Sequence, residues 1–282
     1  MAYSGSPIRI AELLYRPKHS LIDQSLHSDL GAETTNGDGF GIGWYGVGEA
    51  PGVFRSIEPA WNNRNLRDVT EHIESPLVFA HIRAAIGSAV QETNCHPFRY
   101  GRWLFMHNGA IREWATLKRD LALAVDPSLY ASIEGSADTE VFFYLALTFG
   151  LEDDPPAAIE AAVGYIEETG KKHGVEDPIQ MTVATTDGRL TWAFRYSSER
   201  DSRTLFYSTN VETVRNLHPE VEALQLLSDD ARFIVSEPIG ALPGAWNAVP
   251  EWTYGIVGQG QDSMHPFKPR APAHPTAIPA GV

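Results

Sequence analysis

Two short apolar runs in the first half of the chain each lead into polar residues that could do chemistry. They are residues 77–80, which lead into His81 and Arg83, and residues 103–106, which lead into His107, Asn108 and Gly109. Short apolar runs bounded by turn signals are typical of buried strands, so we expect these groups at the rim of a sheet. The Arg83 guanidinium is a planar fork that matches a carboxylate. Asn108 and Gly109 can offer a side-chain N–H and a backbone N–H to a developing oxyanion.

The elements that must position these residues occur in blocks. Periodicity and capping signals predict helices over residues 8–15, 62–74, 111–123, 141–147 and 155–172. Strand patterns occupy residues 40–45, 53–57, 179–185, 190–196, 204–208, 231–236 and 252–257, with Asp187-Gly188 as a hairpin turn. Ser136 is expected to cap the helix that contains residues 141–147. Because strands and helices do not alternate strictly, the pattern predicts an α+β fold with antiparallel sheets and helices outside.

A glycine-rich segment, Asn36–Tyr45, precedes the first of these motifs. A phosphate-binding loop would need a Lys-Ser/Thr pair and a following helix, and the sequence has neither here. We therefore favour a tight turn that leads into a strand and shapes a pocket.

Composition limits the class of protein. The chain has 282 residues, 43% of them hydrophobic, and a formal charge of −14, which argues against nucleic-acid and anionic-membrane partners. The single cysteine, Cys95, excludes an internal disulfide framework and fits a reducing cytoplasm. No run of about 18 apolar residues occurs, and the first residues lack a signal-peptide pattern. We expect a cytoplasmic enzyme or binding domain over residues 1–258, followed by a Pro/Gly-rich tail over residues 259–282, extended or disordered from Asp262 on.

Five motifs in this order and spacing resemble those of the class II glutamine amidotransferases, which use an N-terminal cysteine as nucleophile. The motifs are Asp38-Gly39-Phe40-Gly41-Ile42, His81-Ile82-Arg83, Asn94-Cys95-His96-Pro97-Phe98, His107-Asn108-Gly109 and Asp138-Thr139-Glu140. Within the family the chain looks most like short stand-alone members of the YafJ type, and more distantly like ergothioneine-pathway hydrolases. The resemblance extends from the N-terminus to about residue 240. One such motif would carry little weight, whereas five in register are specific.

The resemblance implies a fold and a set of roles. The fold would be the four-layer αββα sandwich of N-terminal-nucleophile hydrolases. Arg83 would bind the α-carboxylate of glutamine and Asp138 its α-ammonium group, with His107 also in the substrate pocket. Asn108 and Gly109 would hold the oxyanion. A thiolate would form a glutamyl thioester and release ammonia, and water would then release glutamate; no metal or organic cofactor is implied.

The sequence departs from the family pattern at the nucleophile. Ala2 follows Met1, and no cysteine lies near the N-terminus; residues 2–5 resemble the part of the first strand that lies a few residues after the family's cysteine. Our hypothesis is that the chain begins late, with its true start upstream, and that the polypeptide as printed does not hydrolyse glutamine. Ile86 also replaces a threonine common in relatives, which leaves a γ-glutamyl amide open as the substrate.

Less specific interpretations remain open for several residues. Cys95 could be the nucleophile, but its sequence context suggests no lowered pKa and favours a small buried hydrophobe. His81, His96 and His107 could bind a metal, but their separations of 15 and 11 positions match no helical ligand pair. Arg83 alone could form a structural ion pair. Because Asn108, Gly109 and Asp138 have complementary expected roles, we favour a substrate-binding role for Arg83.

Three classes of function follow. The first is an amidohydrolase acting on glutamine or a γ-glutamyl small molecule. The second is a catalytically dead relative that binds glutamine-like ligands, and the third is a subunit that docks on a synthase.

Overall fold

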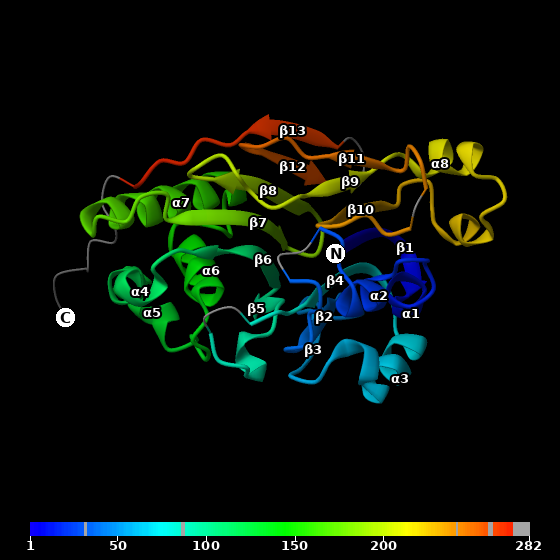
Figure 1. The fold of residues 1–282 in the computed structure, drawn as a ribbon, viewed down its shortest axis with the longest axis horizontal. Coiled ribbons are helices and arrows are strands. Elements are labelled where there is room, and N and C mark those ends of the chain that lie inside the picture. Colours follow the sequence, from blue (N-terminus) through cyan, green and yellow to red (C-terminus); the bar gives the residue numbers. More distant parts are fainter. Residues whose placement is uncertain (31–32, 86–87, 241, 259–261, 273–282) are drawn as a thin grey trace.

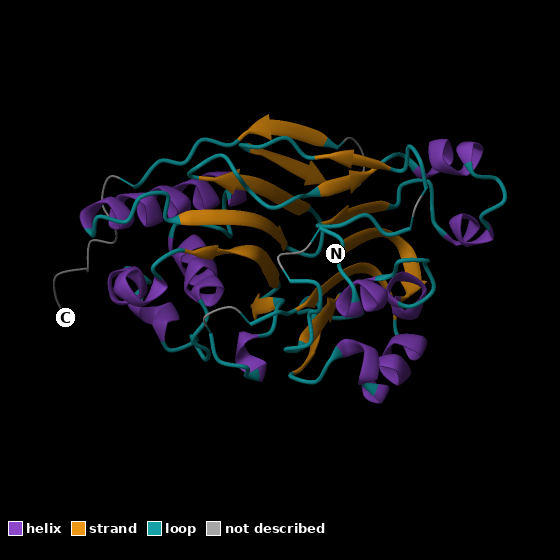
Figure 2. Cartoon of the chain, in the orientation of Figure 1, coloured by secondary structure: helices purple, strands orange, loops and turns teal. Residues whose placement is uncertain are grey.

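Two antiparallel sheets form the centre of the molecule, and helices lie on the outside (Figures 1 and 2). The computed structural model describes residues 1–30, 33–85, 88–240, 242–258 and 262–272. The seven-stranded sheet contains β1 (Ala2–Arg9), β2 (Phe40–Trp44), β3 (Gly52–Ser56), β4 (Glu74–Ile82), β9 (Phe206–Ser208), β10 (Arg232–Val235) and β11 (Trp246–Ala248). Its strand order is β11-β9-β10-β1-β4-β2-β3.

The second sheet has six strands. These are β5 (Phe98–Tyr100), β6 (Trp103–Ile111), β7 (Ile179–Thr186), β8 (Thr191–Ser197), β12 (Thr253–Val257) and β13 (Ser263–Pro266). Their order is β13-β12-β8-β7-β6-β5. Strands β7 and β8 form the antiparallel hairpin that the Asp187-Gly188 turn predicts. Strands β6 and β7 are antiparallel as well.

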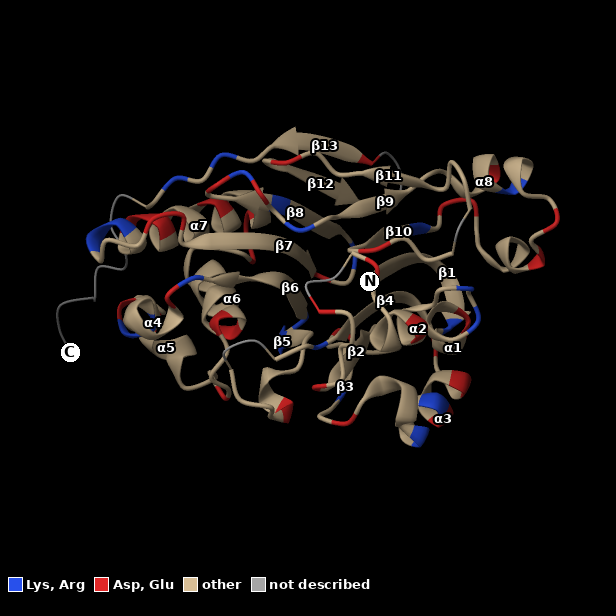
Figure 3. Cartoon of the chain, viewed as in Figure 1, with Lys and Arg blue, Asp and Glu red and all other residues tan. Residues whose placement is uncertain are grey.

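The helices form the two outer layers. They are α1 (Ile10–Leu14), α2 (Leu21–Leu26), α3 (Arg64–His72), α4 (Trp114–Leu123), α5 (Pro127–Tyr130), α6 (Asp138–Thr148), α7 (Pro155–Lys172) and α8 (Val211–Leu217). Helices α1 to α3 pack on the seven-stranded sheet, and α4, α6 and α7 pack on the six-stranded sheet. Residues of both charge signs lie on outer helices such as α3 and α7 (Figure 3). The predicted four-layer αββα arrangement is confirmed.

Strand alternation divides the core into three clusters. In β4, Leu77 and Phe79 face a cluster between the two sheets, whereas Val78 and Ala80 face the helices outside the seven-stranded sheet. This follows from the two-residue period of a strand, which sends successive side chains to opposite faces. The same alternation decides which polar side chains enter the space between the sheets.

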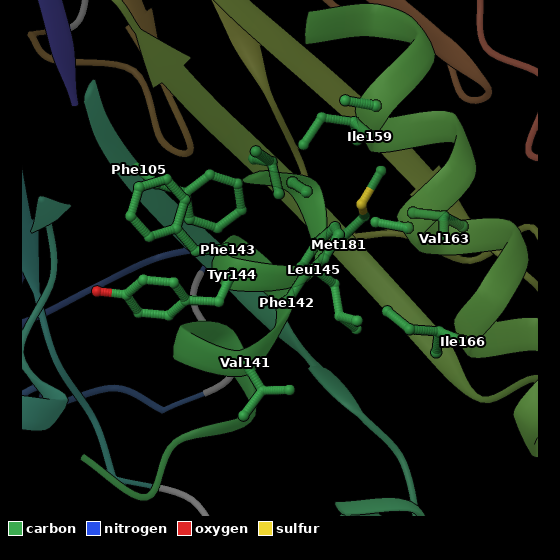
Figure 4. Packing of buried hydrophobic residues seen from close by; sticks show 14 of the residues in the cluster. Phe105, Val141, Phe142, Phe143, Tyr144, Leu145, Ile159, Val163, Ile166 and Met181 are labelled. Atoms are coloured by element: carbon green, nitrogen blue, oxygen red, sulfur yellow. The ribbon is translucent and has the colours of Figure 1, made fainter. Parts of the chain in front are cut away.

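Helix α6 is apolar nearly all round because it is covered on several sides. Every residue from Thr139 to Leu147 is buried. Its Phe143 ring stacks on Phe105 of β6 with ring centroids 5.1 Å apart, and Met181, Ile159 and other side chains of the cluster complete the packing (Figure 4). The predicted core role of residues 141–147 is confirmed.

Several expected boundaries differ. Residues 8–9 belong to β1, so the first helix begins at Ile10; β6 continues to Ile111, so α4 begins only at Trp114. Ala137 occupies the N-cap of α6 and its side chain makes no capping hydrogen bond, so the expectation for Ser136 was wrong.

The Pro/Gly-rich composition of the C-terminal segment is misleading for residues 263–272. Residues 263–266 form β13 on the edge of the six-stranded sheet, and Phe267 is 1% exposed. The backbone N–H of Arg270 donates to the carbonyl of Glu160 on α7. The buried ring of Phe267 and the backbone hydrogen bonds thus hold a segment that composition alone predicts to be a tail. The predicted domain boundary between residues 258 and 259 stays a prediction. Among the described residues, no helix is long and apolar enough to cross a membrane.

Candidate active site

A cavity of about 250 Å³ lies where β4, β6, the start of α6 and the segment before β9 meet. Its wall includes all five residues that the sequence predicts for the site: Arg83, His107, Asn108, Gly109 and Asp138. Ile86 lies outside the described residues. The structure therefore brings together residues that are up to 55 positions apart in the chain, from Arg83 to Asp138.

The site groups of β6 lie within the strand and not beyond its end. The strand runs to Ile111, so the expectation that residues 107–109 follow it was wrong. Leu104 and Met106 face between the sheets, and Asn108 continues the same alternation. On β4, His81 continues the face of Phe79 in the same way. An apolar layer between the sheets thus changes to a polar one at His81 and Asn108.

His81 and Asn108 contact each other across this layer, with Nε2 of His81 2.8 Å from Oδ1 of Asn108. Burial, with a smaller contribution from the α-amino group of Met1, lowers the pKa of His81 to about 3. The neutral ring can donate to Oδ1 only from a protonated Nε2, which leaves Nδ1 unprotonated. This buried Nδ1 has no hydrogen-bond partner among the described residues. The Asn108 amide then has its Nδ2 free for an oxygen in the cavity, since no described residue accepts a hydrogen bond from it.

Gly109 occupies a position that only glycine fits. Its φ is +139°, and a Cβ there would overlap the carbonyl oxygen of Gln180 on β7 and lie 2.7 Å from Nε2 of His107. The backbone of β6 therefore approaches β7 closely beside Asn108. Gly109 also lines the cavity; the role of its backbone N–H as an oxyanion donor stays a prediction.

The His107 side chain is almost completely buried, and both ring nitrogens have partners within the protein. It is 3% exposed, with Nδ1 2.9 Å from Oγ1 of Thr139 and Nε2 3.3 Å from the carbonyl of Gln180. Burial lowers its pKa, while the charge of Asp138 acts in the opposite direction. The ring joins β6 to α6 and β7 at the cavity wall; a direct contact with substrate stays a prediction.

Arg83 also lines the cavity and is 5% exposed. Its Nη2 donates to Oγ of Ser88 at 2.7 Å and to the carbonyl of Ala89 at 3.0 Å, and its Nη1 donates to the carbonyl of Asp38 at 3.4 Å. Three of the five guanidinium N–H groups are thus engaged. Its backbone N–H donates to the carbonyl of Gly39, so the predicted glycine-rich turn does shape this wall.

Asp138 is the first residue of α6. Its Oδ2 accepts from the backbone N–H of Ile111 at 2.7 Å, and its Oδ1 accepts from that of Thr139 at 2.7 Å. A carboxylate at a helix N-terminus is favoured by the helix dipole. An ionised carboxylate offers about four acceptor positions, so Asp138 can still receive an ammonium group.

Asn94 braces the cavity from behind. Its Oδ1 accepts from the backbone N–H groups of Ser136 and Ala137, and its Nδ2 donates to the carbonyl of Ala89 and to Oγ of Ser136. This fully buried amide ties the loop after β4 to the loop before α6. The motif that contains Asn94 was noticed in the sequence, but its bracing role was not.

The alternative uses of Cys95 and the histidines gain no support. Cys95 is buried outside the cavity wall, and burial raises the pKa of its thiol. The ring of His96 packs on that of His81 with centroids 4.2 Å apart, and burial lowers the pKa of His96 well below its usual value. Within the described residues, the ligand atoms that converge as a possible metal group belong to His19, Asp29 and Glu237 instead.

Besides the exposed Glu33, sequence reasoning missed two charged residues of the wall, Arg203 and Glu237. Glu237 is 5% exposed and holds residues 28–30: it accepts from the hydroxyl of Ser28 and from the backbone N–H groups of Asp29 and Leu30. Burial alone would raise its pKa, but these hydrogen bonds outweigh burial and lower it. Neither residue belongs to a motif, so no local signal could have found them.

Comparisons with known proteins agree with this geometry. Residues 20–224 match the family of glutamine amidotransferases, class II. The chain is 33% identical over 290 residues to the probable glutamine amidotransferase DUG3 of Saccharomyces cerevisiae, covering 93% of this chain and 81% of that protein. It is 27% identical over 190 residues to the gamma-glutamyl-hercynylcysteine sulfoxide hydrolase of Mycolicibacterium smegmatis, covering 67% of this chain and 78% of that one.

Solved structures agree as well. A glutamine aminotransferase class-II domain protein from Silicibacter pomeroyi matches with a TM-score of 0.72 and 28% identity, over 95% of this chain and 97% of that one. The glutamine PRPP amidotransferase of B. subtilis shares the fold, with a TM-score of 0.61 and 14% identity over 95% of this chain and 48% of that one. The chain therefore belongs to the class II glutamine amidotransferases.

Proposed function

We propose that this chain cleaves the amide of glutamine, or of a γ-glutamyl compound, through a glutamyl thioester. The observation that carries the proposal is the cavity, where the free Nδ2 of Asn108 and the bare backbone of Gly109 lie in one wall with Arg83 and Asp138. In this arrangement Asp138 receives the α-ammonium group and Arg83 the α-carboxylate of the glutamyl moiety. The amide oxygen then lies at Asn108 and Gly109.

The chemistry divides into two steps. A thiolate attacks the amide carbon, and the negative charge that develops on oxygen is stabilised by the two N–H donors. The C–N bond breaks as nitrogen takes a proton and leaves as ammonia or an amine, which gives the thioester. Water attacks the thioester, and glutamate and the thiol are released. An ammonia acceptor and a partner synthase stay predictions from the resemblance.

The geometry indicates where a nucleophile would enter. Met1 lies in the cavity wall and pairs with Ala80 of β4. In the register of β1 and β4, residues added in front of Met1 would pair in turn with His81, Ile82 and Arg83. A cysteine three positions ahead of Met1 would share the face of Ala2, which points between the sheets toward β6.

The test is glutamate release from glutamine and from γ-glutamyl methylamide. Three proteins are compared: the printed chain, a version in which an N-terminal cysteine and two spacer residues precede Met1, and the same version with serine in place of that cysteine. The proposal expects activity in the cysteine version alone. Equal activity in all three would place the nucleophile elsewhere, with Cys95 the first to substitute, and would contradict the proposed entry of the thiolate.

A second candidate function is binding of a glutamine-like ligand without turnover. It is favoured by one observation, that the chain's single cysteine lies outside the cavity wall. Binding of glutamine by calorimetry, with no glutamate released by the cysteine version, would select this function over the hydrolase.

A further inference from the structure

We propose that Arg203 binds a second carboxylate of the substrate, on the amine side of the scissile amide, so that the preferred substrates are γ-glutamyl amino acids or peptides. This inference rests on the proposed function and names the substrate class of the same cavity. A γ-glutamyl amino acid carries two carboxylates and one ammonium group, whereas glutamine carries one of each.

Arg203 is the cation of the cavity wall that has no partner. It lies in the segment between β8 and β9, and its Nε is buried without a hydrogen bond. Within the described ranges, no hydrogen bond or ion pair engages its guanidinium. Arg203 as a whole is half-buried, so only its Nε is withdrawn from water. An unpaired guanidinium in a cavity wall is suited to binding an anion.

The backbone on both sides of Arg203 is held in place. Oγ of Ser202 accepts from Nε of Arg195 at 2.9 Å, and the hydroxyl of Thr204 donates to the carbonyl of Ser236 at 2.8 Å. These two hydrogen bonds fix the backbone position from which the Arg203 side chain extends, although this side chain has no partner among the described residues. A pre-positioned guanidinium loses less freedom when it binds a carboxylate.

The acidic residues of the same wall do not neutralise it. The two carboxylate oxygens of Glu237 already accept from His19, Ser28 and two backbone N–H groups. Asp138, at the start of α6, accepts from the backbone N–H groups of Ile111 on β6 and Thr139 on α6. Glu33, the third acidic residue of the wall, is exposed. Among the described residues, no carboxylate lies within 4 Å of the guanidinium of Arg203, so its charge remains for a ligand.

The two arginines of the cavity come from different parts of the fold. Arg83 follows β4 beside the glycine-rich turn, whereas Arg203 precedes β9. The charge of Arg203 also contributes, after burial, to the lowered pKa of His107, which indicates that its guanidinium lies near the strand of Asn108. Asn108 and Gly109 of β6 line the same cavity as the two arginines. A ligand bound to both arginines would place its amide at β6, with one carboxylate at each end.

Calorimetry of the printed chain tests the inference without turnover. The probes are glutamine, γ-glutamylglycine and γ-glutamyl methylamide, of which the last two differ only in the second carboxylate. We expect γ-glutamylglycine to bind about 10- to 100-fold more tightly than the methylamide, as one charge-assisted contact would give. R203Q should remove this preference and R203K restore part of it, while R200Q, at an exposed arginine of the same segment, should keep it.

The outcomes separate the two proposals. If glutamine and the methylamide bind but γ-glutamylglycine gains nothing, or if R203Q keeps the preference, the role of Arg203 is wrong and the proposed function stands. If none of the three compounds binds to the folded chain, the proposed function fails as well. Equal thermal midpoints of R203Q and the unsubstituted chain show that a lost preference is not a loss of folding.

Discussion

Lowering the pH from 7.5 to 5.5 is expected to destabilise the folded chain through the histidines whose pKa values are lowered in the fold, with His81 as the clearest case. In the fold, the pKa of His81 is lowered to about 3 from an ordinary value of 6.5. The unfolded chain therefore binds a proton below pH 6.5 that the folded chain does not. Because the unfolded state gains protons, the free energy of unfolding falls as the pH falls.

The magnitude follows from the two pKa values of His81. One pH unit below 6.5 costs about 1.4 kcal/mol for each histidine that stays neutral in the fold. His81 alone therefore accounts for about 1.4 kcal/mol between pH 7.5 and 5.5, and for about 5 kcal/mol at pH 3, where the effect levels off. His96 acts in the same direction, since burial lowers its pKa well below the usual value.

Urea unfolding at pH 7.5, 6.5 and 5.5 measures this effect as the slope of unfolding free energy against pH. H81Q should reduce the slope by up to about 1.4 kcal/mol per pH unit, which corresponds to one proton. H72Q, which removes an exposed histidine of α3, should reduce the slope by less. Comparing slopes isolates His81 from the hydrogen bond that either variant loses. An unchanged slope in H81Q would refute the reasoning, because the ring would then be charged or hydrated in the fold, and it could not hold Asn108 as described.

Three further substitutions test other parts of the structure. N108A in the cysteine-bearing version should lower kcat for glutamate release by about 10²- to 10³-fold, since one oxyanion donor is lost; an unaltered kcat would contradict that role. G109A should reduce the free energy of unfolding by about 1–3 kcal/mol or more, measured in urea, because its Cβ would overlap the carbonyl of Gln180. F143A should cost about 3–5 kcal/mol in the same assay, whereas L123A, at a 63% exposed site, should change little.

Much of the fold could be predicted because the sequence repeats its signals locally. The runs at residues 77–80 and 103–106 are strands, and residues 141–147 are the buried part of a helix, because apolar runs of these lengths are buried whichever partner covers them. Element ends were less predictable. Strand β6 extends through His107, Asn108 and Gly109 because backbone pairing with β7 continues there, although the side chains have become polar. Polarity marks the change from core to cavity on one face of the strand; it does not mark the end of the strand.

The segment after residue 258 shows a second limit of composition. Proline and glycine predict a tail, yet Phe267 packs in the core beside Tyr196 and Phe194 with ring centroids 5.4 and 5.5 Å away. The burial of one aromatic ring stabilises the fold about as much as the burial of several weakly apolar side chains. Average composition therefore underestimates how firmly this segment is held. The anchor is visible only when the partners on β8 are known.

Some residues of the candidate site can be recognised from local sequence motifs, whereas others can be recognised only from contacts in the folded chain. Arg83, Asn108 and Gly109 belong to motifs, and their residue types alone suggest anion binding. Arg203 carries no such signal, because its meaning depends on which acidic side chains are already engaged around it. Glu237, an acidic residue of the same wall, already accepts hydrogen bonds from residues 28–30, more than 200 positions away. If Arg203 binds the second carboxylate as proposed, substrate choice in this cavity depends on pairings between distant segments, which no single motif of this sequence shows.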